Sequence, residues 1–119
     1  KAALRTLFND LQHEVHTLAA RTGFWKTPQV DPYKDHDSEV DDWVIARKLA
    51  LVHCEVSEAL EVVRQDTPNA DMQAFTTELA DIVIRVMDIA GWCGGDLMSR
   101  IIDKHEINAD RPYRHGKRF

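Results

Sequence analysis

The sequence predicts a single all-α domain, residues 1–119, built as a four-helix bundle. Apolar residues recur at helical spacing of three and four along most of the chain, and glycine or proline interrupts this pattern at only a few places. The chain has 119 residues, of which 44% are hydrophobic and 29% charged, as in soluble globular domains. Because helices this short often complete their core by association, we expect a homodimer or a homotetramer.

The first helix is predicted from about Ala3 to Thr22, and Gly23 should end it. His13 and His16 lie beside its apolar stripe and fit surface positions. The stripe consists of Leu4, Leu7, Phe8, Leu11, Val15 and Leu18.

Residues 24–40 are predicted to form a loop, because the segment contains Pro28, Pro32 and a run of polar and charged residues. Aromatic rings in or near this segment can stack on a nucleobase, at about 1–3 kcal/mol each, or simply fill a core. Of Trp25, Tyr33 and Trp43, we select Trp25 as the candidate for stacking.

The second helix is predicted to start at the capping box Ser38–Asp41 and to reach about Gln65. Its apolar stripe is Ile45, Leu49, Val52, Val56, Leu60 and Val63. Lys48 lies two turns before Glu55 on the acidic side of this helix, where it either contacts a phosphate or balances charge.

The third helix is predicted from about Asp71 to Trp92, ending at Gly94 and Gly95, with the apolar stripe Phe75, Leu79, Ile82, Val86 and Ile89. Arg85 and Asp88 follow Asp81 on one flank, either as groups that support a site or as a solvated face. A fourth helix, about Leu97 to Asn108, should be capped by Asp96.

The break at Thr67-Pro68-Asn69 predicts that the second and third helices are antiparallel neighbours. Glu58 and Glu55 lie 10 and 13 residues before Pro68, and Glu78 and Asp81 lie 10 and 13 residues after it. At 1.5 Å of rise per residue, both acid pairs are therefore roughly 15–20 Å from the turn. The two pairs should face each other beside the core.

Four converging carboxylates predict a divalent-cation site. Acids three residues apart on a helix stack on one side, and four of them raise one another's pKa unless a cation lies among them. An all-oxygen set formed by Glu55, Glu58, Glu78 and Asp81 suits Mg²⁺ or Mn²⁺ better than zinc. A single Glu-x-x-Glu pair, in contrast, usually marks a solvated helix face.

The chain carries Glu55-x-x-Glu58, followed after 19 residues by Glu78-x-x-Asp81. This spacing resembles the signature of the MazG-like, all-α nucleoside triphosphate pyrophosphohydrolases. The segments KLALVHCEVSEALE (48–61), ELADIV (78–83) and KHEINADR (104–111) are similar as well, and the resemblance covers roughly residues 10–115. The family often carries a further acid where this chain has Cys54. The loop after the first helix is longer here than in the related dCTP pyrophosphatases.

The resemblance implies Mg²⁺-dependent hydrolysis of a nucleoside triphosphate to the monophosphate and pyrophosphate. Mg²⁺ held by the four acids would neutralise the triphosphate, lower the pKa of a water and orient it for in-line attack, with one of the acids taking the proton. His16 and Trp25 match residues that help enclose the base, and Lys104, Asn108 and Arg111 match residues that hold the triphosphate. Arg114 and Lys117 are added from charge alone.

The net charge of −5 argues against a general nucleic-acid binder, although the tail RPYRHGKRF (111–119) is strongly basic. Cys54 and Cys93 have no metal-ligand spacing and are interpreted as buried thiols in a reducing compartment. No apolar run approaches the ~20 residues that span a bilayer, and no signal peptide is visible. We therefore expect a cytoplasmic protein without membrane contact.

Two alternatives stay open. The chain is either this enzyme or a catalytically silent helical oligomer that binds a nucleotide or a protein partner. A di-iron bundle fits less well, because that site needs two Glu-x-x-His pairs and Asp10-x-x-His13 is only a loose imitation of one.

Overall fold

The computed structural model describes residues 1–25, 38–65 and 71–118. For residues 38–42 it describes the backbone but not the side chains. Within these ranges the chain forms four α-helices and no strand, which confirms the predicted all-α class. None of the described helices combines the length and the apolar composition needed to span a bilayer.

Helix α1 (Ala2–Arg21) ends as the sequence predicts, at Gly23. The φ of Gly23 is +92°, a value that side chains with a Cβ rarely adopt. This turn lets Phe24 N donate to Ala19 O at 3.1 Å and Gly23 N donate to Ala20 O at 3.3 Å, so two carbonyls of the last turn are satisfied. The turn sends the chain directly into Phe24 and Trp25.

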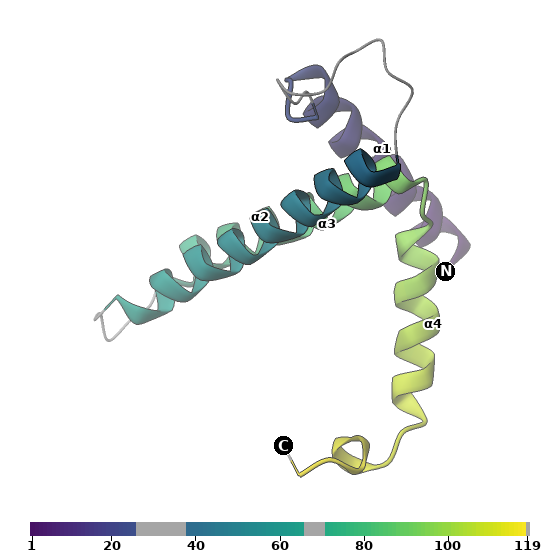
Figure 1. The fold of residues 1–119 in the computed structure, drawn as a ribbon. Helices are drawn as coiled ribbons and strands as arrows, with labels where there is room; N and C mark the ends of the chain where they lie inside the picture. The colour runs from purple at the N-terminus through teal and green to yellow at the C-terminus, as the bar shows by residue number, and fades with distance from the viewer. Residues whose placement is uncertain (26–37, 66–70, 119) are drawn as a thin grey trace.

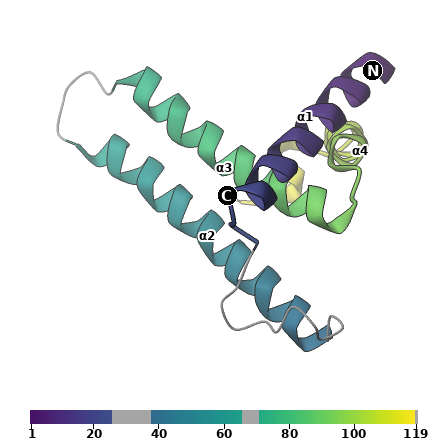
Figure 2. The ribbon, with the colours of Figure 1, turned by 90° about the horizontal axis from the view of Figure 1, so that it is seen from above.

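Helices α2 (Ser38–Arg64) and α3 (Met72–Cys93) run side by side in opposite directions (Figure 2). Asp71 caps α3, its carboxylate accepting from Gln73 N at 3.0 Å and Ala74 N at 3.2 Å. Gly94 ends α3 with a φ of +69°. The break at Thr67-Pro68-Asn69 and the side chains of the Ser38–Asp41 capping box lie outside the described residues, as do Pro28, Pro32 and Tyr33.

Helix α1 lies across the C-terminal half of α3 (Figure 2). The two helices approach closely at Gly91, where a Cβ would lie 2.6 Å from His16 Cβ. Gln12 is buried in the same region and donates from Nε2 to Gly95 O at 2.9 Å. Helix α1 and the hairpin of α2 and α3 therefore form one packed unit.

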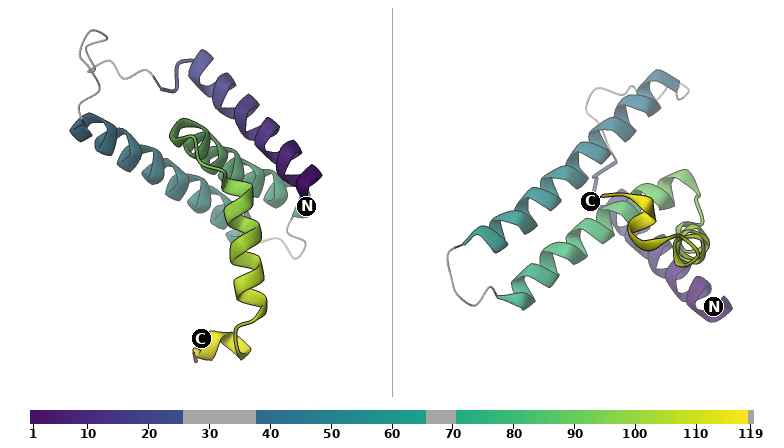
Figure 3. Two further views of the ribbon diagram at one scale, coloured as in Figure 1. Left: turned by 90° about the vertical axis from the view of Figure 1, so that its right-hand side faces the viewer. Right: turned by 90° about the horizontal axis from the view of Figure 1, so that it is seen from below.

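Helix α4 (Leu97–Ala109) points away from this unit (Figures 1 and 3). Asp96 caps it by accepting from Ser99 N at 3.1 Å and Ser99 Oγ at 2.7 Å. A short 3₁₀ turn, η1 (Tyr113–Gly116), follows, in which Arg114 and His115 have left-handed φ values of 55° and 52°. The four helices of the described ranges thus do not close into a bundle by themselves.

The predicted apolar stripes of α1 and α2 are largely uncovered within one chain, whereas only Leu79 of the α3 stripe is exposed. In α2, Leu49, Val56, Leu60 and Val63 are 48–53% exposed, whereas Lys48 and Ala59 on the adjacent face are buried. In α1, Leu4, Leu7, Leu11 and Leu18 are exposed and Gln12 is buried. The reason is that α2 and α3 meet along the face that carries Lys48 and Glu55, not along the most apolar one.

The dimensions of the chain agree with an uncovered core. The radius of gyration is 17.6 Å, whereas a compact chain of this length has roughly 13–14 Å. The accessible surface is 9573 Å², roughly 3,000 Å² more than a folded monomer of this mass exposes.

The prediction of buried cysteines is wrong, because both thiols are exposed and free. Cys54 lies one residue before the half-buried Glu55 and therefore on a neighbouring, solvent-facing part of α2. Cys93 is the last residue of α3, where the helix ends at the surface.

Candidate functional site

Three of the four predicted acids come together between α2 and α3. One carboxylate oxygen from each of Glu55, Glu58 and Glu78 lies within 4.8 Å of the other two. Glu55 and Glu78 are half-buried and Glu58 is exposed. Asp81 is outside this group of three, but it is half-buried one turn after Glu78 and shares a pocket wall with Glu55.

The crowding of these carboxylates acts on the pKa of Glu58. Its pKa is raised above the usual value of 4.5, chiefly by a hydrogen bond with the Glu55 side chain and by the charge of Glu55, with smaller contributions from desolvation, Glu78 and Asp81. Two carboxyl groups can share a hydrogen bond only if one of them holds a proton. The other three predicted acids therefore all act electrostatically on Glu58.

The donor set fits a hard divalent cation. Every candidate ligand is a carboxylate oxygen, which Mg²⁺ and Mn²⁺ prefer. In addition, Glu78 Oε2 is buried and has no hydrogen-bond partner among the described residues. A buried carboxylate oxygen that lacks a donor is costly, and a cation beside it would satisfy it.

Arg85 already supplies a positive charge to this group of acids. Its Nε donates to Glu55 Oε1 at 2.6 Å, and the two side chains are only 32% and 12% exposed. The pair links α3 to α2 at the edge of the acid group. It also means that Glu55 is shared between the other carboxylates and a guanidinium.

A pocket of about 430 Å³ opens beside the acids. Its lining is mostly apolar and comes from α1, the Phe24 turn and α3, with four charged side chains from α2 and α3. The apolar residues include Val15, Leu18, Ala19, Phe24 and Ile84, and the charged ones are Glu55, Asp81, Arg85 and Asp88. A mainly apolar hollow with a few polar groups on one side is typical of small-molecule sites.

Asp88 joins the pocket to the predicted base-binding residues. This buried carboxylate accepts from His16 Nδ1 at 2.8 Å and from Trp25 Nε1 at 2.9 Å, both at Oδ1. The bond to Asp88 uses only Nδ1 of His16, so the other ring nitrogen, Nε2, takes no part in it. The structure therefore brings His16 and Trp25 together, although neither lines the pocket itself.

The ring of Trp25 is in contact with other side chains. It stacks on Trp92 with centroids 5.5 Å apart and an interplanar angle of 2°, and His16 meets it edge-on at 5.3 Å. The Lys48 ammonium lies 4.3 Å from its centroid. Trp25 thus anchors the start of the segment after α1. Trp43, the other aromatic candidate among the described residues, is exposed on α2.

Lys48 is buried and donates from Nζ to Phe24 O at 2.6 Å. Burial lowers its pKa, while the nearby Asp88 carboxylate opposes that shift. In the structure Lys48 holds the Phe24 turn against α2. Its two predicted roles, contact with a phosphate or balance of charge, stay predictions.

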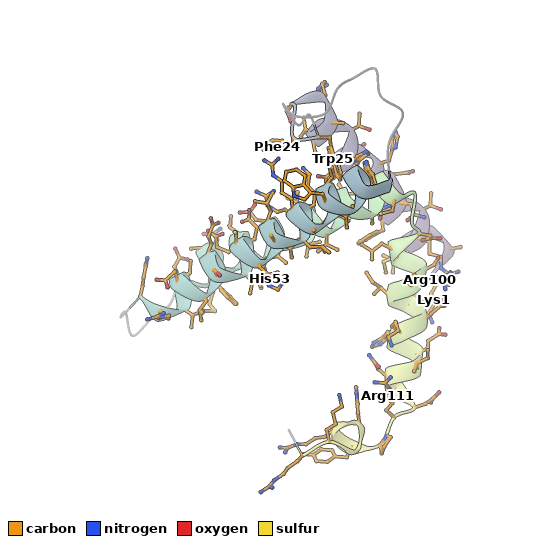
Figure 4. The ribbon with its side chains drawn as sticks, in the orientation of Figure 1. Lys1, Phe24, Trp25, His53, Arg100 and Arg111 are labelled. Atoms are coloured by element: carbon orange, nitrogen blue, oxygen red, sulfur yellow. The ribbon has the colours of Figure 1, made fainter. Side chains whose placement is uncertain are left out.

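The predicted triphosphate-binding residues lie apart from the acids of the same chain. Lys104, Asn108, Arg111 and Arg114 are exposed on α4 and the segment that follows it. Figure 4 shows Arg111 at the far end of α4, with Phe24 and Trp25 on one side of α2 and His53 on the other. Lys117 belongs to the same basic end of the chain.

The sequence left two roles open for Arg85 and Asp88, support of a site or a solvated face. The available signal was their spacing, because Glu78, Asp81, Arg85 and Asp88 follow one another at intervals of three, four and three residues and so share one flank of α3. In the structure that flank faces α2 and α1. The charged residues on it therefore lie at an interface between helices and not on a solvated face.

Comparison of the chain with protein-family models, with curated proteins and with solved structures found no match.

Proposed function

We propose that this protein is a Mg²⁺-dependent nucleoside triphosphate pyrophosphohydrolase, with Mn²⁺ as an alternative metal, that releases pyrophosphate and a nucleoside monophosphate. The observation that carries the proposal is the convergence of Glu55, Glu58 and Glu78 within 4.8 Å beside a mostly apolar pocket of about 430 Å³. A triphosphate needs cation-binding acids, and a nucleoside needs an adjoining apolar hollow, so one substrate class uses both features.

The roles of the residues follow from their positions. Glu55, Glu58 and Glu78 would hold the cation, and Asp81 on the pocket wall is the nearest further carboxylate. The bound cation would neutralise phosphate charge and lower the pKa of a water. Phe24 and Leu18 would exclude bulk water from the nucleoside, and Asp88 would hold His16 and Trp25 at the rim.

We further propose that the active unit is a homodimer or a homotetramer with a completed bundle. The apolar stripes of α1 and α2 and the roughly 3,000 Å² of excess surface match the area that obligate subunit interfaces bury. In such an assembly, Lys104, Asn108 and Arg111 would reach the triphosphate on the acids of another copy, since α4 points away from those of its own chain (Figure 1).

The test is a screen for phosphate release from common and damaged nucleotides, with a coupled inorganic pyrophosphatase and Mg²⁺. Glu58→Ala and Asp81→Ala should each lower turnover at least about 100-fold, because each removes a carboxylate that holds the cation needed to neutralise the reacting phosphate. Glu61→Ala is the matched control, since Glu61 lies one turn further along α2 and pairs with Arg64 at the surface.

Full activity of Glu58→Ala with an unchanged helical circular dichroism spectrum would refute the metal assignment. If no nucleotide releases pyrophosphate in the presence of Mg²⁺ or Mn²⁺, the silent helical oligomer is the better description. The exposed apolar stripes are the observation that favours that second candidate.

A further inference from the structure

Arg85 occupies a carboxylate that a divalent cation would need. Its Nε is 2.6 Å from Glu55 Oε1, and Glu55 is one of the three acids whose oxygens converge. A guanidinium and a divalent cation that share one carboxylate group cannot both keep their best geometry, because the two positive charges repel each other.

We propose that Arg85 is a resident counter-cation that a divalent cation displaces from Glu55 when it binds. The proposal rests on the proposed function only in its metal site. It assigns Arg85 a regulatory role: the ion pair lowers the affinity of the free protein for the cation, and the cation frees the guanidinium.

The surroundings of Arg85 support an exchange of partners. The ion pair is mostly shielded from water, so the pair is stronger than a surface one and competes effectively. Asp81 and Asp88 line the same pocket as Arg85, and they lie one turn before it and one turn after it on α3. The freed guanidinium therefore has carboxylates within the pocket wall to stabilise it, and it stays beside the nucleoside pocket.

The first experiment measures Mn²⁺ binding by electron paramagnetic resonance, with no nucleotide present. Arg85→Met removes the charge and keeps an unbranched side chain, so the variant should bind Mn²⁺ about tenfold more tightly than wild type, which corresponds to about 1.4 kcal/mol. Arg100→Met is the control, because it removes one positive charge from an exposed i,i+3 pair with Asp103 on α4. It should leave the affinity within about twofold of wild type.

The second experiment separates displacement from a general effect of charge. In wild-type protein labelled with ¹⁵N, addition of Mg²⁺ should shift the Arg85 Nε–H resonance and speed its exchange with water, because the hydrogen bond to Glu55 is broken. This measurement needs no variant, so it stands even if Arg85→Met fails to fold.

The outcomes are distinct. Wild-type binding of Mn²⁺ with an Arg85 Nε–H signal that Mg²⁺ leaves unchanged would overturn this inference and leave the proposed metal site intact. Equal or weaker Mn²⁺ binding by folded Arg85→Met would do the same. No Mn²⁺ binding by wild type would overturn both the inference and the metal site on which it rests.

Discussion

At the scale of single residues, the site contains more carboxylates than positively charged partners. Glu55 raises the pKa of Glu58, Glu78 keeps a buried oxygen without a partner among the described residues, and Arg85 pairs with Glu55. Asp88 shows the opposite situation, since its one oxygen accepts two donors. Charge at the acids is thus available for a ligand, while Oδ1 of Asp88 is used for structure.

The raised pKa of Glu58 predicts how stability depends on pH in metal-free protein. Because the folded state holds this proton more tightly than the unfolded chain, the contribution of Glu58 is most favourable below its usual pKa of 4.5 and is lost as the pH rises through the higher folded value. Glu58→Gln should therefore raise the melting temperature near neutral pH and lose this advantage below about pH 4.

Thermal denaturation in EDTA over a series of pH values measures this effect. Glu61→Gln serves as the control, because the Glu61 and Arg64 side chains are both well exposed, and it should change the melting temperature little at any pH. A melting temperature of Glu58→Gln below that of wild type at neutral pH would contradict the prediction.

Asp88→Ala should destabilise the fold by about 2–3 kcal/mol, because it leaves the His16 and Trp25 ring N–H groups without their acceptor. Asp88→Asn keeps an acceptor oxygen and should lose clearly less. Urea denaturation at a fixed protein concentration, followed by tryptophan fluorescence, gives both values. A loss below about 0.5 kcal/mol in Asp88→Ala would show that the two bonds contribute little.

At the scale of helices, the site depends on how closely α1 approaches α3. Gly91 allows this approach, because a Cβ there would meet the Cβ of His16, which cannot move without its backbone. On the same pair of helices, His16 Nδ1 lies 2.8 Å from Asp88 Oδ1. A helical glycine, normally unfavourable by about 1 kcal/mol, is therefore retained for packing.

Gly91→Ala should lower stability by about 1–2 kcal/mol, since the clash exceeds the gain in helix propensity. Gly95→Ala is a suitable control, because a Cβ at Gly95 would have only Ala90 O nearby, at 3.8 Å. Chemical denaturation of both variants tests this, together with the ¹⁵N signals of the His16 ring. Unchanged stability and an unperturbed His16 ring in Gly91→Ala would mean that α1 adjusts without cost.

At the scale of the whole molecule, one chain exposes what a completed bundle would cover. The extents of 51 × 38 × 31 Å reflect a packed unit of α1, α2 and α3 with α4 projecting from it (Figure 3). The apolar stripes and the basic end of the chain are both directed away from the acids. Association of two or more copies would bury the apolar stripes and bring the basic end of the chain to the acids of a neighbouring copy.

A complementation experiment tests this arrangement. Glu58→Ala and a double variant, Lys104→Ala with Arg111→Ala, should each be inactive alone. If each site combines acids from one copy with α4 residues from another, the co-expressed population should regain about a quarter of wild-type activity, because half of its dimers are mixed and each mixed dimer has one intact site of two. No recovery in mixed dimers isolated with two tags would show that both sets act within one chain.

The sequence by itself determined the helices and the candidates for the acid site. Periodicity and caps placed α1, α3 and α4 to within about two residues, because Gly23, Asp71, Gly94 and Asp96 act locally. Three-residue spacing likewise determined that Glu55 and Glu58 share one side of α2. These features depend on residues close in the chain, so no distant contact was needed to predict them.

Only the tertiary structure decided which partner each charged group has. Arg85 pairs with Glu55, Lys48 binds the Phe24 carbonyl, and Asp88 holds His16 and Trp25, all through contacts between different helices or turns. Such pairs depend on the rotation and register of one helix against another, which periodicity leaves open because an apolar stripe does not specify what covers it. For the same reason, the exposed stripes and the projecting α4 became visible only in the folded chain.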